Sequence, residues 1–213
     1  MIKRGRLLVI EGLEGAGKST ALHFLQTMLQ AEGIQVITTR EPGGTAVGET
    51  VRKLLTHAEQ ESLDSKTELL LFYAARVQLL ETVIKPALSQ GIWVLADRWE
   101  LSSFAYQCGG RGIHPTILKQ LSDWCIGETQ PDVLFYLDIS PDIGLQRAQM
   151  RGKLDRIEQE SLTFFQAVHA AYHSYLPRFR STVTIDASQP LAQVHADLER
   201  AMRQYLVAQH DLV

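Results

Sequence analysis

The stretch GLEGAGKS, residues 12–19, decides the fold, because it matches the pattern of Gly, four residues, Gly, Lys and Ser or Thr. A short apolar run, Leu7–Ile10, precedes it and is typical of a buried strand. Apolar residues recur at helical spacing from Ala21 to Leu29, which predicts an amphipathic helix. The segment is therefore predicted to be a strand, a glycine-rich loop and a helix, whose backbone N–H groups and dipole form an anion-binding nest.

The loop also carries side chains suited to a nucleoside triphosphate. In this motif Lys18 reaches the β- and γ-phosphates, and the hydroxyl of Ser19 binds Mg²⁺. Asp97, which ends a later apolar run, is the predicted acidic partner that holds the ion through water. The alternative is a glycine turn that binds nothing, which the complete motif in its strand and helix context disfavours.

Length and composition are those of a globular protein with one domain, predicted to span residues 1–213. The formal net charge of −3 gives no sign of a broad basic surface for nucleic acid. The two cysteines, Cys108 and Cys125, do not suggest a disulfide framework. No apolar stretch approaches transmembrane length, and the run after Met1–Arg4 is too short for a signal peptide. We therefore expect a cytoplasmic enzyme that binds neither nucleic acid nor membrane.

Apolar strands alternate with helical segments along the chain, which indicates an α/β fold with a parallel sheet covered on both faces. The expected strands are Leu7–Ile10, Ile34–Thr39, Ile92–Ala96, Val133–Leu137 and Val183–Ile185. Helices are expected over residues 21–29, 47–55, 65–83, 102–107, 115–127, 141–151, 164–177 and 191–208. Ser65 and Glu68 form a capping-box pattern at the start of a long helix, which Pro86 bends or follows with a new turn.

Polar features fall at the predicted strand ends: the glycine loop, Arg40–Glu41, Asp97–Arg98 and Asp138. In open α/β sheets ligands bind at the carboxyl ends of the strands, so we expect these segments to meet at one site. The planar guanidinium of Arg98 is suited to clamp a phosphate. The alternative for Asp97–Arg98 is a local ion pair that ends a strand.

Three arginines surround a short glycine-containing segment. Arg147 and Arg151 share a helix face because they are four residues apart, and Arg156 follows just beyond the interruption. This arrangement predicts a mobile lid, about residues 147–158, whose cations neutralise a transferring phosphoryl group. The alternative is a solvated charged face balanced by acidic neighbours.

Two aromatic and polar pairs are candidates for contacts with a base and a sugar. Phe72 and Arg76 lie about one helical turn apart, so the ring would stack on a base while the guanidinium bonds a base carbonyl. Tyr106 and Gln107 would likewise line the base and the sugar. The alternative for Phe72 is an aromatic side chain that packs in the core. The alternative for Tyr106 and Gln107 is a half-buried tyrosine beside a surface amide.

These motifs occur in the same order in bacterial thymidylate kinases, and the chain resembles that family from about Leu7 to the final helix. The motifs are GLEGAGKS at 12–19, TREPGG at 39–44, FYAAR at 72–76, DR at 97–98, AYQ at 105–107, GGRG at 109–112 and DRIE at 155–158. The resemblance implies a P-loop nucleoside monophosphate kinase fold with five parallel strands in the order 2-3-1-4-5 and a short lid. It also implies a homodimer that uses ATP and Mg²⁺ to phosphorylate dTMP to dTDP, for dTTP synthesis.

The resemblance assigns roles to the matching positions. The implied ATP-binding residues are Gly12, Leu13, Glu14, Gly15, Ala16, Gly17, Lys18, Ser19, Thr20 and Arg147. The implied dTMP-binding residues are Glu14, Arg40, Pro42, Arg52, Phe72, Arg76, Arg98, Ser103, Tyr106 and Gln107. The implied catalytic residues are Lys18, Arg98, Arg151 and Arg156, and the implied Mg²⁺ ligands are Ser19 and, through water, Asp97.

Individual contacts follow from the same resemblance. Glu14 would accept a hydrogen bond from the 3′-hydroxyl of dTMP, Phe72 would stack on thymine, and Arg76 would bond its O4. Because the glycine loop carries no arginine, the sequence resembles the bacterial type in which the lid supplies the catalytic cation. Replacement of Arg156 is therefore expected to lower kcat far more than it raises KM, although the sequence does not decide which lid arginine dominates.

Two residues depart from the family pattern: Trp99 follows the Asp-Arg pair, and Cys108 stands where glycine is common. Rival functions also remain. A deoxynucleoside kinase would use a carboxylate such as Glu41 to deprotonate the 5′-hydroxyl of thymidine. A nucleotide-binding switch would bind and slowly hydrolyse a nucleotide without any acceptor, and a structural module would bind none.

Overall fold

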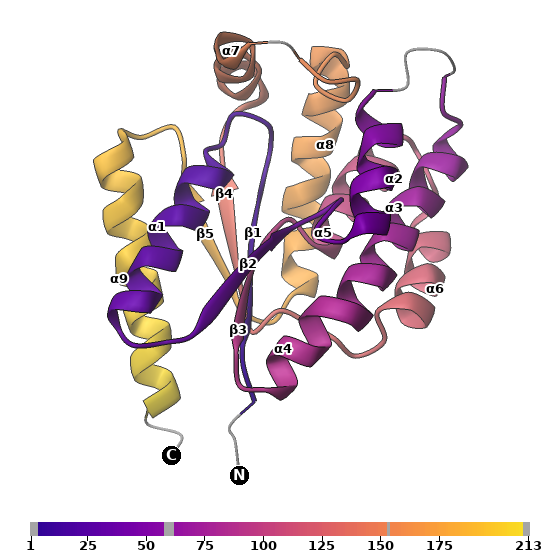
Figure 1. The fold of residues 1–213 in the computed structure, drawn as a ribbon. Coiled ribbons are helices and arrows are strands. Elements are labelled where there is room, and N and C mark those ends of the chain that lie inside the picture. The colour runs from indigo at the N-terminus through magenta and orange to yellow at the C-terminus, as the bar shows by residue number, and fades with distance from the viewer. Residues whose placement is uncertain (1–3, 58–61, 153, 211–213) are drawn as a thin grey trace.

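A five-stranded parallel sheet forms the centre of the computed structural model, which describes residues 4–57, 62–152 and 154–210 (Figure 1). The strands are β1 (Leu7–Gly12), β2 (Val36–Arg40), β3 (Trp93–Asp97), β4 (Val133–Asp138) and β5 (Thr182–Asp186). Their order is β2-β3-β1-β4-β5 and each neighbouring pair is parallel, which confirms the expected topology. The residues before Arg4, and Lys153 in the predicted lid, lie outside the described residues.

Each strand extends further toward its carboxyl end than the apolar pattern predicted. β1 continues from Ile10 to Gly12, and β3 continues from Ala96 to Asp97. Hydrogen bonds between backbones extend the strands, and such pairing does not require an apolar side chain. Asp97, for example, is the register partner of Ile10. The polar residues at these ends are therefore held rigidly at one edge of the sheet.

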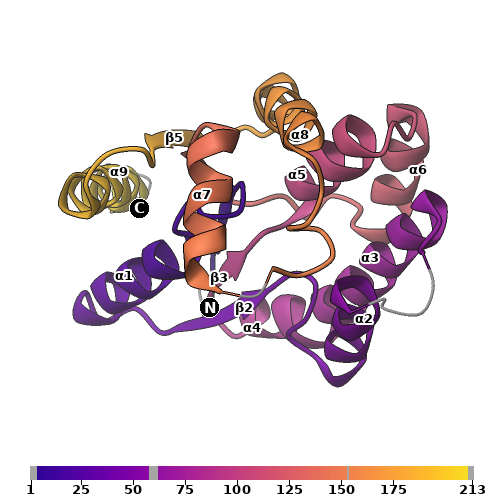
Figure 2. The same ribbon diagram turned by 90° about the horizontal axis from the view of Figure 1, so that it is seen from above.

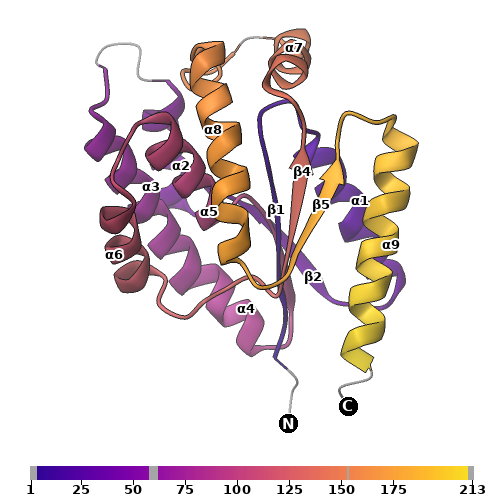
Figure 3. The ribbon, with the colours of Figure 1, turned by 180° about the vertical axis from the view of Figure 1, so that it is seen from behind.

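Helices cover both faces of the sheet. They are α1 (Lys18–Ala31), α2 (Ala46–Thr56), α3 (Ser65–Leu79), α4 (Lys85–Ser89), α5 (Glu100–Ser103), α6 (Pro115–Cys125), α7 (Pro141–Arg151), α8 (Leu162–Tyr175) and α9 (Leu191–His210). Helices α1 and α9 pack on one face, and α3, α4, α5 and α8 lie on the other (Figures 1 and 3). Helix α7 crosses above the carboxyl ends of the strands, as the view from above shows (Figure 2). No helix of the described chain is long and apolar enough to cross a bilayer.

Short irregular helical turns join some of these helices. A π-helical turn over Leu80–Ile84 links α3 to α4, and Pro86 stands in the first turn of α4, where its missing N–H is tolerated. A second π-helical turn, Phe104–Gly110, follows α5. The helix expected over residues 102–107 is therefore a short α-helix that begins at Glu100 and continues as a π-helical turn.

The capping box predicted for Ser65 and Glu68 is wrong. Asp64 is the N-cap of α3, and its side chain accepts a hydrogen bond from the backbone N–H of Lys66 at 2.9 Å. Glu68 does not reach back to the helix start; it is only 2% exposed and faces arginines from other elements. Because these arginines lie far away in the sequence, the local pattern could not reveal them.

Candidate active site

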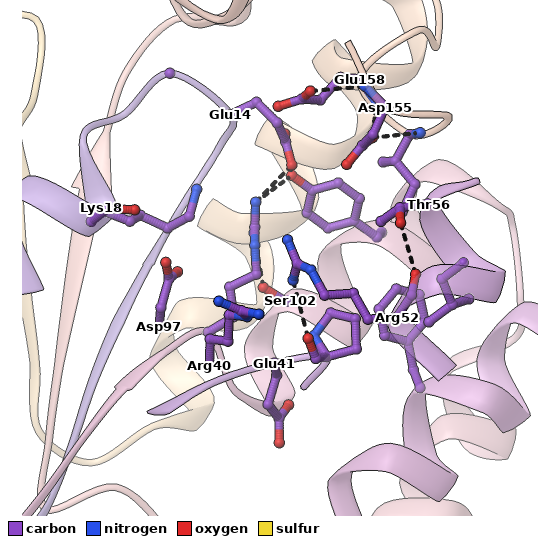
Figure 4. Close-up of a pocket in the computed structure, with 18 of the residues that line it drawn as sticks. Glu14, Lys18, Arg40, Glu41, Arg52, Thr56, Asp97, Ser102, Asp155 and Glu158 are labelled. Carbon is purple, nitrogen blue, oxygen red and sulfur yellow. Dashed lines mark hydrogen bonds and ion pairs between the residues drawn. The ribbon is translucent and has the colours of Figure 1, made fainter. Parts of the chain in front are cut away.

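A cavity of about 570 Å³ opens at the carboxyl ends of β1, β2 and β3, and Figure 4 shows side chains that surround it. This volume is within the range of about 300–1,000 Å³ that small-molecule sites occupy. Most of the predicted site residues line it, namely Glu14, Gly15, Gly17, Lys18, Ser19, Thr20, Arg40, Pro42, Arg52, Phe72, Arg76, Asp97, Arg98, Ser103, Tyr106, Gln107, Arg147 and Arg151. Segments far apart in the sequence thus meet at one site, but Asp138, which was expected there as well, does not line the cavity.

Four predicted site residues do not line the cavity. Gly12 ends β1 behind the loop, and the side chains of Leu13 and Ala16 are buried in the core. Arg156 lies to one side of the cavity, against α2 and α3. The first three hold the shape of the glycine loop, whereas the position of Arg156 bears directly on its predicted catalytic role.

The glycine loop adopts backbone conformations that favour glycine. Gly15 and Gly17 have φ angles of 74° and 88°, in the left-handed region. A Cβ atom on Gly15 would lie 2.1 Å from the carbonyl oxygen of Gly144 in α7. The loop therefore needs glycine both for its turn and for its close contact with the helix that carries Arg147 and Arg151.

Lys18 is held over this loop. Its Nζ atom donates hydrogen bonds to the carbonyl oxygens of Gly12 at 3.1 Å and Leu13 at 2.7 Å. Burial and the nearby Arg98 cation lower the pKa of Lys18 to about 8. The negative charge of a bound phosphate chain would offset burial and the repulsion from Arg98, and so raise the pKa of Lys18 again. This fits the predicted role of the lysine.

Asp97 and Ser19 provide oxygen atoms that fit a Mg²⁺ site. The Oδ1 atom of Asp97 is buried and has no hydrogen-bond partner among the described residues, and Ser19 lines the same cavity. A buried carboxylate oxygen needs a donor, which a water bound to Mg²⁺ would supply. Figure 4 shows Asp97 and Lys18 on the same side of the pocket. The residues present thus fit the predicted ion.

Arg98 is the cation that links the glycine loop to the rest of the pocket. It donates to the Oε1 atom of Glu14 at 2.7 Å and to the carbonyl oxygen of Gly12 at 3.0 Å. The hydroxyl of Tyr106 donates to the other oxygen of Glu14 at 2.5 Å. Burial opposes the charge of Glu14, but the Arg98 and Lys18 cations outweigh it and lower its pKa. Glu14 is thus an ionised acceptor at the junction of the two halves of the pocket.

The backbone of Arg98 is strained. Its φ of 73° lies in the left-handed region, which costs a non-glycine residue about 1–3 kcal/mol. The buried carboxylate of Glu11 holds the turn, because its Oε1 atom accepts from the backbone N–H groups of Trp99 at 2.8 Å and Ser102 at 3.1 Å. The hydroxyls of Ser102 and Tyr172 donate to its Oε2 atom and also accept from Arg98. Glu11 therefore positions Arg98 for the pocket.

Two further arginines converge near the end of β2. Arg40 pairs with Glu49 at 2.9 Å, and Arg52 donates to the carbonyl oxygen of Pro42 at 3.1 Å. Burial and repulsion from Arg40 lower the pKa of Arg52. Figure 4 shows Arg40 and Arg52 at the cavity. Together with Arg98 they line a wall whose positive field an anion would neutralise.

Arg76 lies deeper in the same wall. Its Nε atom pairs with the buried carboxylate of Glu41 at 2.7 Å, and one terminal nitrogen donates to the hydroxyl of Ser103 at 2.9 Å. These bonds fix the plane of a guanidinium that is only 2% exposed. Phe72 and Gln107 line the cavity beside it, and Gln107 is itself oriented by a bond of 3.1 Å to Glu68.

The lid arginines have different surroundings. Arg147 donates to the carbonyl oxygen of Ala187 at 2.7 Å, and Arg151 pairs with Glu158. Both line the cavity, and the side chain of Arg151 is 64% exposed, so it is free to reorient. The mobility predicted for residues 147–158 remains a prediction.

Arg156 is bound away from the cavity. It pairs with Glu68 at 2.5 Å, and its Nε atom donates to the carbonyl oxygen of Leu55 at 2.8 Å. Arg111 pairs with the same carboxylate at 3.1 Å. Because two arginines share one buried acceptor, Arg156 fastens the segment after α7 to α2 and α3, and it does not line the cavity.

Sequence reasoning missed several residues that build the site: Glu11, Glu68, Ser102, Arg111 and Tyr172. One signal was available, because Glu11 is a carboxylate directly after a fully apolar strand. The others gave none: Tyr172 fits the apolar pattern of α8, and the partners of Glu68 lie 43 and 88 residues away. Only the folded chain brings these groups together.

The two departures from the family pattern leave the site intact. Trp99 is fully buried, and its backbone N–H anchors Glu11 as described above. Cys108 and Cys125 are free thiols, as predicted, and burial raises the pKa of Cys108 to about 11. Neither cysteine lines the cavity.

Replacing Glu68 with glutamine is expected to lower the free energy of unfolding by about 2–3 kcal/mol near neutral pH. This is less than the about 3–5 kcal/mol for breaking a fully buried pair, because both arginines partly reach solvent. Burial opposes the charge of Glu68, but its hydrogen bonds to Arg111 and Arg156 lower its pKa below the ordinary 4.5. The stabilisation is therefore full above pH 4.5 and is lost as the pH falls further.

Urea unfolding of both proteins at several pH values measures this difference. Glu160→Gln is the matched control, because Glu160 pairs with Arg111 at 2.6 Å but is 29% exposed. We expect it to cost less than about 1 kcal/mol. Equal losses for the two variants, or a difference that does not shrink in acid, would contradict the role given to Glu68.

Comparison with known proteins identifies the family. A family model described as thymidylate kinase matches residues 10–198. A protein described as thymidylate kinase from Legionella pneumophila strain Corby is 48% identical over 209 residues, which cover 98% of both chains. Its counterpart from strain Paris is 47% identical, again over 98% of each chain. Together with the glycine loop and the arginine-lined pocket, these matches show that the chain belongs to the thymidylate kinase family.

Proposed function

We propose that the protein transfers the γ-phosphoryl group of ATP to dTMP and forms dTDP and ADP. The observation that carries this proposal is the cavity itself, in which the glycine loop faces a second cationic wall. Lys18 and Ser19 begin α1 directly after the loop, whereas Arg40, Arg52 and Arg98 come from other segments. A phosphotransferase with a phosphate acceptor needs two such anion sites, and a hydrolysing switch needs one.

The reaction needs little proton transfer. The attacking oxygen belongs to an already ionised monophosphate, so positioning and charge neutralisation dominate. Arg40, Arg52 and Arg98 would hold the acceptor phosphate, and Lys18 would hold the donor phosphates. Mg²⁺, held by Ser19 and through water by Asp97, would neutralise charge on the phosphate oxygens. Arg151 would add the lid cation as the segment closes and excludes water.

The remaining contacts are proposed from the lining of the cavity and the family resemblance. Phe72 would stack on thymine, Arg76 would bond its O4, and Gln107 would add a polar contact. Tyr106 would crowd the sugar at C2′. Arg147 would stack on adenine.

Two observations argue against a deoxynucleoside kinase. The carboxylate that such an enzyme would use as a base, Glu41, is held by Arg76 in a buried ion pair. A nucleoside also brings no phosphate for the arginine wall.

A coupled assay of ADP release with dTMP, dUMP, dCMP, thymidine and no acceptor separates the possibilities. We expect ADP release with dTMP far above that with dCMP, with thymidine or without an acceptor, and the dUMP arm measures how far the site depends on the thymine methyl group. Release with thymidine alone, or without any acceptor, would overturn the proposal.

Replacing Glu14 with glutamine is expected to weaken dTMP binding by about 10–100-fold, the size of a lost charged hydrogen bond. Glu14 orients Arg98 and Tyr106, and it is proposed to accept from the 3′-hydroxyl. ATP binding should stay nearly unchanged, because the backbone of the loop supplies those contacts. Titration calorimetry with each nucleotide measures both affinities. Glu81→Gln, at an exposed ion pair with Lys85, is the control. If the Glu14 variant lost affinity for dTMP and ATP equally, the specific contact of Glu14 with dTMP would be contradicted.

We further propose a homodimer that works in the cytoplasm. The family resemblance supports it, and apolar side chains exposed on neighbouring helices are consistent with it: Trp124 on α6 is 84% exposed and Leu70 on α3 is 57% exposed. Light scattering of the protein in solution measures its mass directly, and a monomer would contradict the proposal.

A further inference from the structure

A carboxylate and two imidazoles converge at the end of β4, apart from the cavity. His169 and His173 lie one turn apart on α8, and Asp138 is the last residue of β4. The Nε2 atom of His169 is 2.8 Å from the Oδ1 atom of Asp138. The Nε2 atom of His173 is 3.2 Å from that of His169 and 3.3 Å from Oδ2 of Asp138. One ligand atom from each of the three residues thus lies within 4.8 Å of the other two, between the strand and the helix.

These separations fit a single tetrahedral metal ion. Zinc binds imidazole nitrogen and carboxylate oxygen at about 2.0–2.2 Å, which places tetrahedral ligand atoms about 3.3 Å apart. The separations of 3.2 Å between the two Nε2 atoms and 3.3 Å between Nε2 of His173 and Oδ2 of Asp138 lie close to this value. Nε2 of His169 lies 2.8 Å from the other carboxylate oxygen, Oδ1. Two histidines and one carboxylate also match the donor set of zinc sites that keep a fourth position for water.

The surroundings allow an ion to enter and hold the ligands in place. The side chains of Asp138, His169 and His173 are 28%, 26% and 46% exposed, so a water can complete the coordination. The backbone of Asp138 is fixed because its carbonyl oxygen accepts from the N–H of Ala187 at 2.8 Å. The ring of Tyr136 packs edge-on against His173, with centroids 5.6 Å apart. The site is therefore built on a rigid strand and one helix face.

We propose that Asp138, His169 and His173 bind one divalent transition-metal ion of the zinc class. Imidazole nitrogen favours such ions, whereas Mg²⁺ prefers oxygen ligands, so the two ions do not compete for this site. None of the three residues lines the cavity. The ion would join α8 to the end of β4, and Figure 3 shows these two elements from behind.

The position of the site gives the ion a structural effect. Tyr172, next to His173 on α8, donates to Glu11 and accepts from Arg98. An ion that holds α8 against β4 stabilises the helix that carries this hydroxyl. Zinc is therefore expected to raise the melting temperature of the protein, because it binds the folded chain and not the separated ligands.

Titration calorimetry of the full chain, stripped with EDTA and kept in excess Mg²⁺, tests the proposal with Zn²⁺ as the probe. We expect one equivalent to bind and the melting temperature to rise. His169→Gln and His173→Gln should each weaken zinc binding by at least about tenfold, since even outer-shell changes cost about 10–100-fold. Asp138→Asn, which keeps both imidazoles, should weaken it as well. His23→Gln, at an exposed histidine on α1, is the matched control.

A spectroscopic measurement identifies the ligands independently. Co²⁺ in the wild-type protein should show the intense visible absorption of a four-coordinate ion, and both histidine variants should lose it. Far-UV circular dichroism and melting in EDTA establish that the variants fold. Absence of zinc binding, binding that Mg²⁺ displaces, or binding equal in the wild type and the histidine variants would each overturn the proposal.

Discussion

Replacement of Arg98 with methionine is expected to lower kcat/KM for dTMP by at least about 10³-fold, the lower end of what a lost arginine costs in phosphoryl transfer. Arg98 contacts Glu14 and the carbonyl oxygen of Gly12, and it lines the cavity wall proposed for the acceptor phosphate. Methionine keeps the apolar stem but removes the charge. Steady-state kinetics over a range of dTMP concentrations measures the loss.

The same change also tests the buried network behind Arg98. Glu14 would lose its cation, so the free energy of unfolding is expected to fall by about 2–3 kcal/mol, because both side chains of this pair are partly exposed. Arg98→Lys separates the two effects, because it keeps the charge but loses the planar fork. It should recover stability in larger part than activity. Arg178→Met, at an arginine that stacks on Phe104 outside the cavity, is the control. Near-normal kcat/KM in a folded Arg98→Met protein would contradict the proposal that Arg98 contacts the acceptor phosphate.

Replacement of Arg151 with alanine is expected to lower kcat by about 10³–10⁵-fold with little change in KM for dTMP. Arg151 lines the cavity and is paired with Glu158 near the protein surface, so it can turn toward a transferring phosphoryl group. Its charge would matter most in the transition state, which is why kcat and not KM should respond. Single-turnover kinetics separates the chemical step from product release.

Replacement of Arg156 with alanine provides the comparison with Arg151→Ala, because the two arginines have different surroundings. The family resemblance implies a catalytic role for Arg156, but the residue is bound to Glu68 and to the carbonyl oxygen of Leu55. We therefore expect the variant to lose stability and to lose much less kcat than Arg151→Ala. Arg200→Ala, at an exposed pair with Asp197, controls for a general effect of lost charge. A stable Arg156→Ala protein whose kcat falls as far as that of Arg151→Ala would show instead that Arg156 acts in the transition state.

Much of the fold was predictable because the relevant signals are local. Leu7–Ile10 has no exposed side chain, and its continuous apolar run is the mark of a strand buried on both faces. The alternation of strands and helices predicted a parallel sheet, and the glycine pattern placed a phosphate-binding loop at its centre. The strand order itself depended on family resemblance, since no local signal chooses the neighbours of β1.

The candidate site was predictable only in part. Residues such as Arg40 and Asp97 stand at strand ends, so the rule that strand ends share an edge brought them to one place. Residues on helices were harder, because a helix must also be rotated correctly about its axis. Glu68 shows the difficulty: its spacing from Ser65 suggested a cap, whereas its side chain faces Arg111 and Arg156.

The sequence by itself determined the glycine loop, the strands and the residue types at their carboxyl ends, because backbone periodicity and turn chemistry act over a few residues. Only the tertiary structure decided the partners of the charged side chains. It bound Arg156 to Glu68, placed Glu11 behind Arg98, and brought Asp138 to His169 and His173. The physical reason is that these contacts depend on how helices pack across a sheet, and a pairing between residues 88 apart leaves no mark in the pattern around either of them.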